Sequence, residues 1–429
     1  MAIIIKLIIF QFYCYLTNNK GNSMEHSSPT DLSPLASNPS QGNWLALLSV
    51  TFSAFALVTG EFLAIGVLND IARDFQISVG TAGLTVSLTA IVGMFAAVLI
   101  PISAKTLDRR TLLLLLTLLM IVANLLTAFA PNFILLLVGR IILGVAVGGF
   151  WATAVALSGR LAPPHLPIAK ATAWVAFGVT LASVLGVPMG TWLAQYNGWQ
   201  TSFTVISLMG VLLFIFQYLY LPQLKPASSL RWKELPILLQ HQAARKGLII
   251  FLFMGFAHFA AYSYFSAFFK HELDFSDGLI SRLLLVYGIA GIFGNIFAGY
   301  LGQINIRYTF AVSGIAFFFA FLSLPLFGTH LLSAIILTAL WGFAYGIIPT
   351  AVNIWMFTHA PEAVEKGMPM VTLTFLILIA LGSMFGGIIV DYFNGTILFF
   401  AMLPLVLCSL TLIFTLARGL NNPSHKQKQ

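Results

Sequence analysis

Two charged residues lie inside the long apolar stretches of this chain, and they point to ion or proton chemistry. Glu61 lies near the middle of the apolar run 44–68, and Arg140 lies within the run 133–158. A charge at the centre of a bilayer costs about 2.5–3.5 kcal/mol even on a lenient insertion scale. Burial favours the neutral form of a carboxyl group, and a nearby cation favours its charged form. We therefore predict that Glu61 carries a proton as its access to water alternates.

Both residues also have structural interpretations. Glu61 could be a carboxyl group that a permanent partner holds in place for packing. Arg140 stays charged at any useful pH, so it cannot be the proton shuttle itself. It could tune Glu61 or the solute electrostatically, or its guanidinium could bind backbone carbonyls of neighbouring helices. Gly144 and Gly148, one and two helical turns after Arg140, predict a close approach of another helix on that face.

A second set of polar and aromatic residues in the apolar runs suits a polar, uncharged solute. Amides and phenols can hydrogen-bond such a solute, and its rings can stack on tryptophan or tyrosine. A histidine titrates near neutral pH, so one in this set could sense a proton gradient or bind the solute. Hydrogen bonding between helices is the alternative for each residue. The predicted solute-binding residues are Trp151, His258, Tyr262, Asn295, Tyr345 and Asn353.

The elements that must position these residues are membrane helices. The chain is 59% hydrophobic and only 8% charged, against about 25% charged residues in soluble domains. It contains twelve apolar runs near the length of about 20 residues that a helical span requires. None alternates with period two, which favours helices over a barrel. The runs cover residues 44–68, 80–103, 111–130, 133–158, 171–195, 199–221, 247–269, 283–301, 309–328, 331–357, 368–390 and 395–417.

The distribution of lysine and arginine predicts the orientation. With both termini inside, 17 of the 21 basic residues fall on the inner side, and only Arg73, Lys270 and Arg282 fall on the outer side. Such asymmetry predicts that both the N- and the C-terminus lie in the cytoplasm. Because the basic residues are spread over short loops, the net charge of +8 does not indicate a nucleic-acid partner.

The ends of the chain and its cysteines carry little chemistry. Residues 1–43 are expected to be a disordered tail, and residues 418–429 a second, cytosolic tail. The apolar stretch at 2–16 lacks a cleavage pattern, so Met24 is the expected true start, with a real extra segment as the alternative. Cys14 lies in the N-terminal extension and Cys408 in the last apolar run, so the two cysteines indicate no disulfide framework and no metal set. We expect no cofactor and no metal.

A weak internal repeat divides the chain. The longest polar connection, 222–246, separates six runs in 44–221 from six in 247–417. Such a repeat predicts two pseudo-symmetric six-helix halves with a ligand site between them near the midplane. The matching positions are Gly93, Phe95 and Arg109 with Gly291, Phe293 and Arg307, 198 residues later, Asp74-Phe75 with Asp274-Phe275, and Arg140-x-x-x-Gly144 with Gly342-x-x-x-Gly346.

The fifth run is interrupted by Gly186, Pro188 and Gly190. A proline inside a helix removes a hydrogen bond and kinks the helix, and glycines permit bending or close packing. The segment is therefore predicted to be a gating hinge, with a static kink as the alternative.

Three stretches together resemble a known family. Residues 136–144 are similar to the arginine-centred fourth-span motif of the major facilitator superfamily, and residues 186–190 resemble its antiporter motif. Residues 148–152, with 160–164, are similar to the purine-ribonucleoside efflux branch, which lies close to the sugar-efflux proteins. The resemblance covers nearly all of 43–418 and is to the twelve-span bacterial drug:proton antiporters. It implies an all-α membrane protein with the major facilitator fold.

The loop between the second and third runs departs from that family. Lys105 stands where the family has an aspartate, and Asp108 stands where it has a glycine. Arg109 and Arg110 match the family's basic residues, so the resemblance implies a gating role for them. The cytosolic latch that the family builds on its aspartate is placed in doubt, although Asp108 could replace it.

The resemblance implies a secondary transporter that exports a small organic solute, purine-nucleoside-like or sugar-like, in exchange for protons. A multidrug antiporter and a proton-coupled uptake symporter of the same fold are the alternatives. An ATP-driven pump is excluded because no Gly-x-x-x-x-Gly-Lys-(Ser/Thr) sequence occurs. An enzyme is disfavoured because the runs contain no clustered nucleophile, acid and base. We expect a monomer in the bacterial inner membrane.

Overall fold

A computed structural model describes residues 43–104, 106–163, 166–224, 240–359 and 361–416. Within these ranges the ordered elements are helices, and no strand occurs. The predicted all-α fold class is therefore confirmed. The expected N-terminal tail with Met24, Lys105, the middle of the linker and the C-terminal tail lie outside the described residues.

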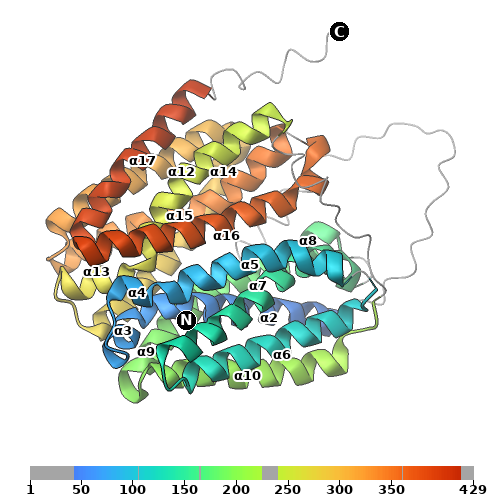
Figure 1. Cartoon of the computed structure of the whole chain (residues 1–429). Helices are drawn as coiled ribbons and strands as arrows, with labels where there is room; N and C mark the ends of the chain where they lie inside the picture. The colour runs from blue at the N-terminus through green and yellow to red at the C-terminus, as the bar shows by residue number, and fades with distance from the viewer. Residues whose placement is uncertain (1–42, 105, 164–165, 225–239, 360, 417–429) are drawn as a thin grey trace, which may run out of the picture. The chain divides into compact units, whose positions relative to one another are not determined.

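The helices form two groups, here called the first half (residues 43–224) and the second half (residues 240–416). Figure 1 shows them in chain order. The first half contains α2 (Trp44–Gly66), α3 (Leu68–Asp74), α4 (Val79–Ala82), α5 (Leu84–Ser103), α6 (Arg109–Ala128), α7 (Phe133–Leu161), α8 (Ile168–Leu181), the π-helix η2 (Ala182–Gly186), α9 (Val187–Asn197) and α10 (Trp199–Tyr220). The second half contains α12 (Gln242–Ser263), α13 (Phe265–His271), α14 (Asp277–Phe327), α15 (Leu331–His359), α16 (Pro361–Tyr392) and α17 (Gly395–Leu416).

Eleven helices among the described residues are long and apolar enough to cross a membrane. One of them, α14, has 51 residues and would be about 76 Å long if straight, against about 30 Å for the hydrocarbon core. Its backbone leaves helical geometry at Asn305. The Asn305 side chain accepts hydrogen bonds from the backbone N–H groups of Arg307 and Tyr308, as a helix N-cap does. Helix α14 thus contains both predicted runs 283–301 and 309–328.

Glycines bring the same pair of helices together in each half. A Cβ at Gly148 of α7 would collide with the carbonyl oxygen of Gly93 in α5. In the second half, a Cβ at Gly346 of α15 would collide with the carbonyl oxygen of Gly291 in α14. These two contacts are 198 residues apart. The close approach predicted from Gly148 is confirmed, because only hydrogen at this position leaves room for the neighbouring backbone.

The structure corrects the register of the repeat around Arg140. Because Gly148 and Gly346 make equivalent contacts, Gly144 corresponds to Gly342, and Thr338 stands at the position of Arg140. The sequence alignment, which matched Arg140 with Gly342, was wrong by one turn. Glycine spacing of four recurs along each helix, so the sequence pattern alone matches in either register.

The pairing of Asp74-Phe75 with Asp274-Phe275 is also wrong, here by two residues. Gln76 and Asp274, again 198 residues apart, are the two non-glycine residues with positive φ among the described residues, at 52° and 55°. The turn that follows the first span of each half therefore fixes the register. Asp74 corresponds instead to Glu272, which accepts a hydrogen bond from the backbone N–H of Gly395.

The fifth span is broken as the sequence predicted, although the break begins earlier. The π-helix η2 joins α8 to α9, and Pro188 lies in the first turn of α9. A Cβ at Gly186 would collide with the Thr59 hydroxyl, and one at Gly190 with the Leu63 side chain. The glycines therefore let α2 pack closely on this span. Whether the break moves as a hinge stays a prediction.

Candidate functional site at the interface of the two halves

Arg140 of α7 is fully buried and ties three helices together. Its Nε donates to the Thr85 carbonyl oxygen at 2.9 Å, Nη1 to that of Gly60 at 3.0 Å, and Nη2 to that of Glu61 at 2.8 Å. Its guanidinium also lies over the Phe203 ring, 5.8 Å from the centroid. The backbone-binding alternative for Arg140 is therefore present in the structure, and it fixes the charge beside α2.

Glu61 of α2 is 3% exposed, yet its carboxyl group lacks a full set of partners. Its Oε1 is buried and has no hydrogen-bond partner in the part of the chain that the structure describes. The side chain is near enough to Arg140 for an electrostatic interaction. The two do not form an ion pair among the described residues, because Arg140 donates to backbone carbonyls. A buried polar atom without a hydrogen-bond partner calls for an explanation, and the proton-carrying role of Glu61 stays a prediction.

Two contacts link Glu61 and its neighbour Phe62 to the second half. The carboxyl group of Glu61 interacts electrostatically with the Tyr345 phenol of α15. The Phe62 ring meets the Tyr262 ring of α12 edge to face, with centroids 6.2 Å apart. Glu61 thus lies at the interface of the two halves, opposite aromatic residues that the sequence analysis assigned to the solute.

His258 of α12 lies at the centre of this aromatic group and is 1% exposed. Its ring stacks on Tyr345 at 3.9 Å and on Tyr262 at 5.3 Å between centroids. Trp341 donates to its Nδ1 at 3.2 Å. Tyr287 of α14 stacks on Tyr262 at 5.0 Å and was missed by the sequence analysis. A tyrosine in an apolar run carries no signal of its own; only the fold brings it here.

Three predicted solute-binding residues are not shown in contact with this cluster. Trp151 is partly buried and meets Phe150 edge to face at 5.5 Å. Asn295 and Asn353 are partly buried, and neither amide has a hydrogen-bond partner within the described residues. Their roles stay predictions.

The predicted gating arginines make their contacts within the first half. Arg109 donates weakly to the Ala104 carbonyl oxygen at 3.5 Å. Arg110 donates a hydrogen bond to the Tyr218 carbonyl oxygen at 2.6 Å, and its guanidinium lies over the Tyr218 ring. Arg307 repeats this arrangement in the second half, with the carbonyl oxygen and ring of Phe414. The contacts of Arg110 hold the start of α6 against α10, and those of Arg307 hold α14 against α17.

Asp108 likewise acts inside the first half. Its Oδ1 accepts from the backbone N–H groups of Arg110 and Thr111 and so caps α6. Its Oδ2 accepts from the backbone N–H of Leu224 at 2.8 Å. The carboxylate therefore joins α6 to the segment that follows α10. Within the described ranges, Asp108 makes no hydrogen bond to the second half.

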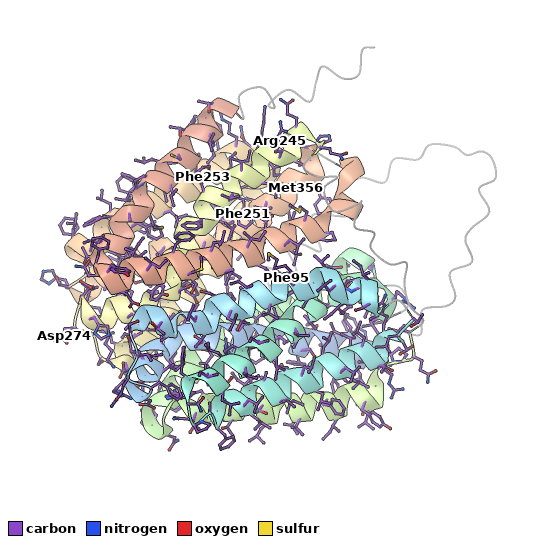
Figure 2. All side chains as sticks on the ribbon, viewed as in Figure 1. Phe95, Arg245, Phe251, Phe253, Asp274 and Met356 are labelled. Carbon is purple, nitrogen blue, oxygen red and sulfur yellow. The ribbon has the colours of Figure 1, made fainter. Side chains whose placement is uncertain are left out.

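Hydrogen bonds between the halves gather at one end of the bundle. We call this the far end, and we call the end where α10 finishes and α12 begins the linker end (Figures 1 and 2). Figure 2 shows Asp274 at the far end and Arg245 at the linker end. The far-end pairs are Asn69 with His271, Ser78 and Gly80 with Asp391, Gly80 with Tyr264, Gly83 with Ser383, and Gln195 with Asp277 and Ser281.

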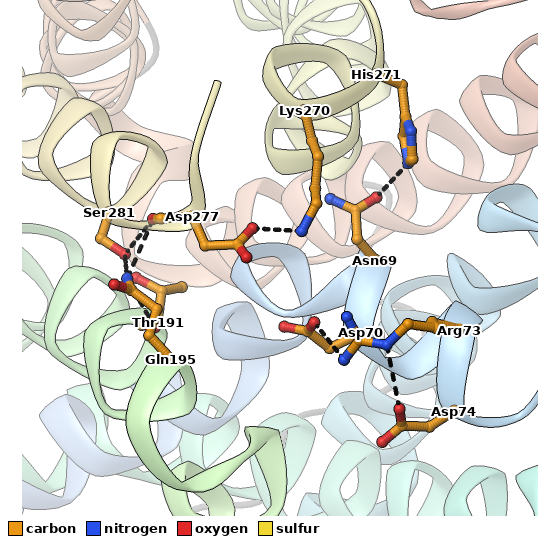
Figure 3. A network of polar contacts seen from close by, with 10 residues as sticks. All are labelled: Asn69, Asp70, Arg73, Asp74, Thr191, Gln195, Lys270, His271, Asp277 and Ser281. Atoms are coloured by element: carbon orange, nitrogen blue, oxygen red, sulfur yellow. Dashed lines mark hydrogen bonds and ion pairs between the residues drawn. The ribbon is translucent and has the colours of Figure 1, made fainter. Parts of the chain in front are cut away.

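A pocket of about 280 Å3 lies at the far end between the halves. Figure 3 shows the polar residues around it, among them Asp70 and Arg73 of α3 and Gln195 of α9. Burial raises the pKa of the Asp70 carboxyl, an effect that the Arg73 guanidinium 3.0 Å away opposes. Asp277 of the second half raises it further. This pocket is separate from the Glu61 region and belongs to the far-end closure.

No group of three or more histidine, cysteine, aspartate or glutamate side chains is arranged to hold a metal ion in the part of the chain that the structure describes. The chemistry available near Glu61 is therefore that of a carboxyl group, a guanidinium, phenols and an imidazole.

Comparisons with known proteins agree with this fold. A model of the Major Facilitator Superfamily matches residues 50–368. The purine ribonucleoside efflux pump NepI of Salmonella paratyphi B (strain ATCC BAA-1250 / SPB7) is 31% identical over 353 residues, which cover 82% of this chain and 88% of that protein. The pump of the same name from Shigella sonnei (strain Ss046) is 31% identical over 365 residues, covering 83% and 92%.

Solved structures share the fold at low sequence identity. A bacterial homologue of the human lysosomal transporter Spinster, in an inward-facing and occupied conformation, has a TM-score of 0.69 at 15% identity, covering 89% of this chain and 98% of that one. Its unoccupied form has a TM-score of 0.67 at 16% identity, covering 86% and 93%. The chain therefore belongs to the Major Facilitator Superfamily and is a membrane transporter, not an enzyme.

Proposed function

We propose that this transporter exports a small, uncharged organic solute of the purine-nucleoside type in exchange for protons, by alternating access between its two halves. The observation that carries this proposal is the buried, unpaired Oε1 of Glu61. This carboxyl group interacts electrostatically with the Arg140 guanidinium of its own half and with the Tyr345 phenol of the other half. Relative movement of the halves would change its surroundings, which is what a proton carrier requires.

The arrangement of inter-half contacts supports alternating access. The excess of lysine and arginine in the loops on the linker side supports a cytoplasmic location for that end. The far end then faces outward, and it is the end that hydrogen bonds hold closed. The proposed conformation is therefore closed to the outside, and alternating access would require these far-end hydrogen bonds to break. The protein would lie in the bacterial inner membrane with both termini inside.

Proton transfer by a single carboxyl group would supply enough free energy to drive export. One elementary charge that crosses 100 mV releases about 2.3 kcal/mol, which corresponds to a solute gradient of roughly fifty-fold. Proton-driven export through Glu61 therefore requires no second titrating residue, and it requires no ATP.

The proposed solute class follows from the side chains that face Glu61. Phenols, an imidazole and aromatic faces can hydrogen-bond and stack a flat, polar ring. One carboxylate and one guanidinium leave no surplus negative charge for a lipophilic cation, which disfavours the multidrug alternative. The relatives named as purine ribonucleoside efflux pumps support the same class. A sugar-like solute and an uptake symporter are the remaining alternatives.

The test uses purified protein in liposomes loaded with a labelled purine ribonucleoside. Acidifying the outside should accelerate release, because inward proton flow drives solute out. Glu61→Gln keeps the size and hydrogen bonding of the side chain but cannot titrate. This variant should lose the acid-driven acceleration and should retain exchange of labelled for unlabelled solute.

Glu272→Gln is the matched control, because it also replaces a glutamate by glutamine. Glu272 lies outside the spans, and its carboxylate caps α17 of the second half. It should keep the wild-type response to acid. Full acid-driven release by Glu61→Gln would move the coupling to another residue. Slower release on acidification would identify a symporter.

A further inference from the structure

The hydrogen bond between Trp341 and His258 determines the chemical form of the imidazole. An indole Nε1–H can only donate. Because Trp341 donates to Nδ1 at 3.2 Å, Nδ1 must carry a lone pair, and the ring proton must lie on Nε2. A protonated imidazole carries N–H groups on both nitrogens and would set two donors against each other. The contact is therefore compatible only with the neutral Nε2–H tautomer.

The second nitrogen agrees with this assignment. Nε2 lies 3.5 Å from the Tyr287 hydroxyl oxygen, which can accept from Nε2–H. The aromatic rings around His258 come from Tyr262 on its own helix, Tyr287 on α14, and Trp341 and Tyr345 on α15. None of these residues carries a charge at neutral pH. The tautomer is thus set by one donor, the Trp341 indole.

The imidazole in this form supports Tyr345. The two rings are nearly parallel, 14° apart, with centroids separated by 3.9 Å. Tyr345 is only partly buried, and its hydroxyl has no hydrogen-bond partner among the described residues. Its phenol also interacts electrostatically with Glu61 of the first half. A ring that is backed on one side and has a free hydroxyl is suited to stack and hydrogen-bond a flat solute.

We propose that Trp341 is a positioning residue for solute recognition: it holds His258 as the neutral Nε2–H tautomer beneath Tyr345, so that Tyr345 presents a fixed aromatic face to a purine-type ring. The identity of the solute rests on the proposed function. The assignment of the His258 tautomer rests only on the hydrogen bond from Trp341. Under this proposal His258 supports the binding site and takes no part in proton transfer.

Trp341 could instead serve only to fill the core. It is fully buried and also packs on Phe265, Phe321 and Phe399, with centroids 5.4–5.5 Å away. Trp341→Phe keeps an aromatic ring and removes the N–H donor. Trp355→Phe is the matched control on the same helix: Trp355 is equally buried, and its Nε1 donates to the Ala243 carbonyl oxygen, away from His258.

The first measurement is solid-state 15N NMR of protein with ring-labelled histidine, in which His258→Phe identifies the His258 signal. The wild type and Trp355→Phe should show a single Nε2–H form between about pH 5 and pH 8, the range in which free histidine titrates. Trp341→Phe should show mixed tautomers and a protonated form toward acid. A single Nε2–H form in Trp341→Phe would overturn the proposal.

The second measurement is the Kd of a labelled purine ribonucleoside. Trp341→Phe should raise it about fivefold at neutral pH, the factor that one net hydrogen bond represents, and further toward acid. The double variant Trp341→Phe/His258→Phe should lose the added acid dependence. An unchanged Kd in Trp341→Phe, together with altered tautomers, would overturn the recognition role. If the wild type binds no purine ribonucleoside, the proposed solute class is wrong, and the NMR result alone decides the role of Trp341.

Discussion

Asp391, near the end of α16, accepts a hydrogen bond at 2.7 Å from the backbone N–H of Gly80 at the start of α4. The same carboxylate accepts from the Ser78 hydroxyl at 2.6 Å. A side chain of the second half thus completes the N-terminal turn of a helix in the first half. Backbone N–H groups at a helix N-terminus have no partner within their own helix, so this contact stabilises the helix end only while the far end is closed.

Replacing Asp391 by alanine should open the far end. The change removes two hydrogen bonds, each with a net value of about 1.5–3 kcal/mol when one partner is charged. Spin labels on Cys replacing Phe129 and Phe393, which are exposed at the far end of each half, would report the change as longer distances. Cys14 and Cys408 would first be replaced by serine. Glu272→Ala is the control, since the hydrogen bonds of Glu272 stay within the second half; equal opening in both variants would contradict the assignment.

Gly80 takes part in the same contact, so a larger side chain at this position should also open the far end. A Cβ at Gly80 would collide with the Asp391 carboxylate and with the Gly387 carbonyl oxygen. Alanine is normally better than glycine in a helix by about 0.5–1 kcal/mol, yet Gly80→Ala should prevent complete closure. A membrane-impermeant maleimide added outside should then label Ser383→Cys, which is buried in wild type. Gly299→Ala, where a Cβ meets nothing within 4 Å, should leave the labelling rate unchanged.

The far-end pocket should make stability depend on pH. The pKa of Asp70 is raised, chiefly by burial, so the folded protein holds this proton more tightly than the unfolded chain does. The resulting stabilisation is present at acidic pH and is lost as pH rises through the folded-state pKa. Asp70→Asn should therefore raise the Tm at pH 7, and the difference should vanish toward acid. Asp274→Asn changes an exposed carboxyl at the same end and serves as control; an Asp70→Asn effect that grows toward acid would contradict the prediction.

The spans could be predicted from sequence because their signal is local. Each run of about 20 apolar residues can satisfy its backbone only as a helix in a bilayer, and the described helices lie close to the predicted runs. The exception is α14, where only the break at Asn305 separates two runs. The register of the repeat could not be found in the same way. Glycines recur at spacings that match in more than one alignment, and only helix contacts and the turns at Gln76 and Asp274 decide between them.

The site was predictable in part for a similar reason. Glu61 and Arg140 stand out in sequence because an intramembrane charge is costly. The hydrogen-bond partners of Arg140 are backbone carbonyl groups. Every residue type has such a group, so the sequence does not show which residues bind Arg140. Tyr287 matters because it lies near His258, and Asp391 matters because it binds Gly80; both partners lie on other helices. Such pairings depend on tertiary structure, so a single sequence does not show them.

The solute class can be tested in cells. The polar groups of the aromatic cluster around His258 are phenols and an imidazole, and the imidazole is neutral in the Trp341 contact. They can stack and hydrogen-bond a base, but they offer no second carboxylate to hold a permanent cation. Overexpression should therefore protect cells from a toxic purine nucleoside analogue more than from an ethidium-like dye, measured as the shift in inhibitory concentration. Glu61→Gln should abolish this protection. Stronger protection against the dye, lost in the same variant, would instead identify a multidrug pump.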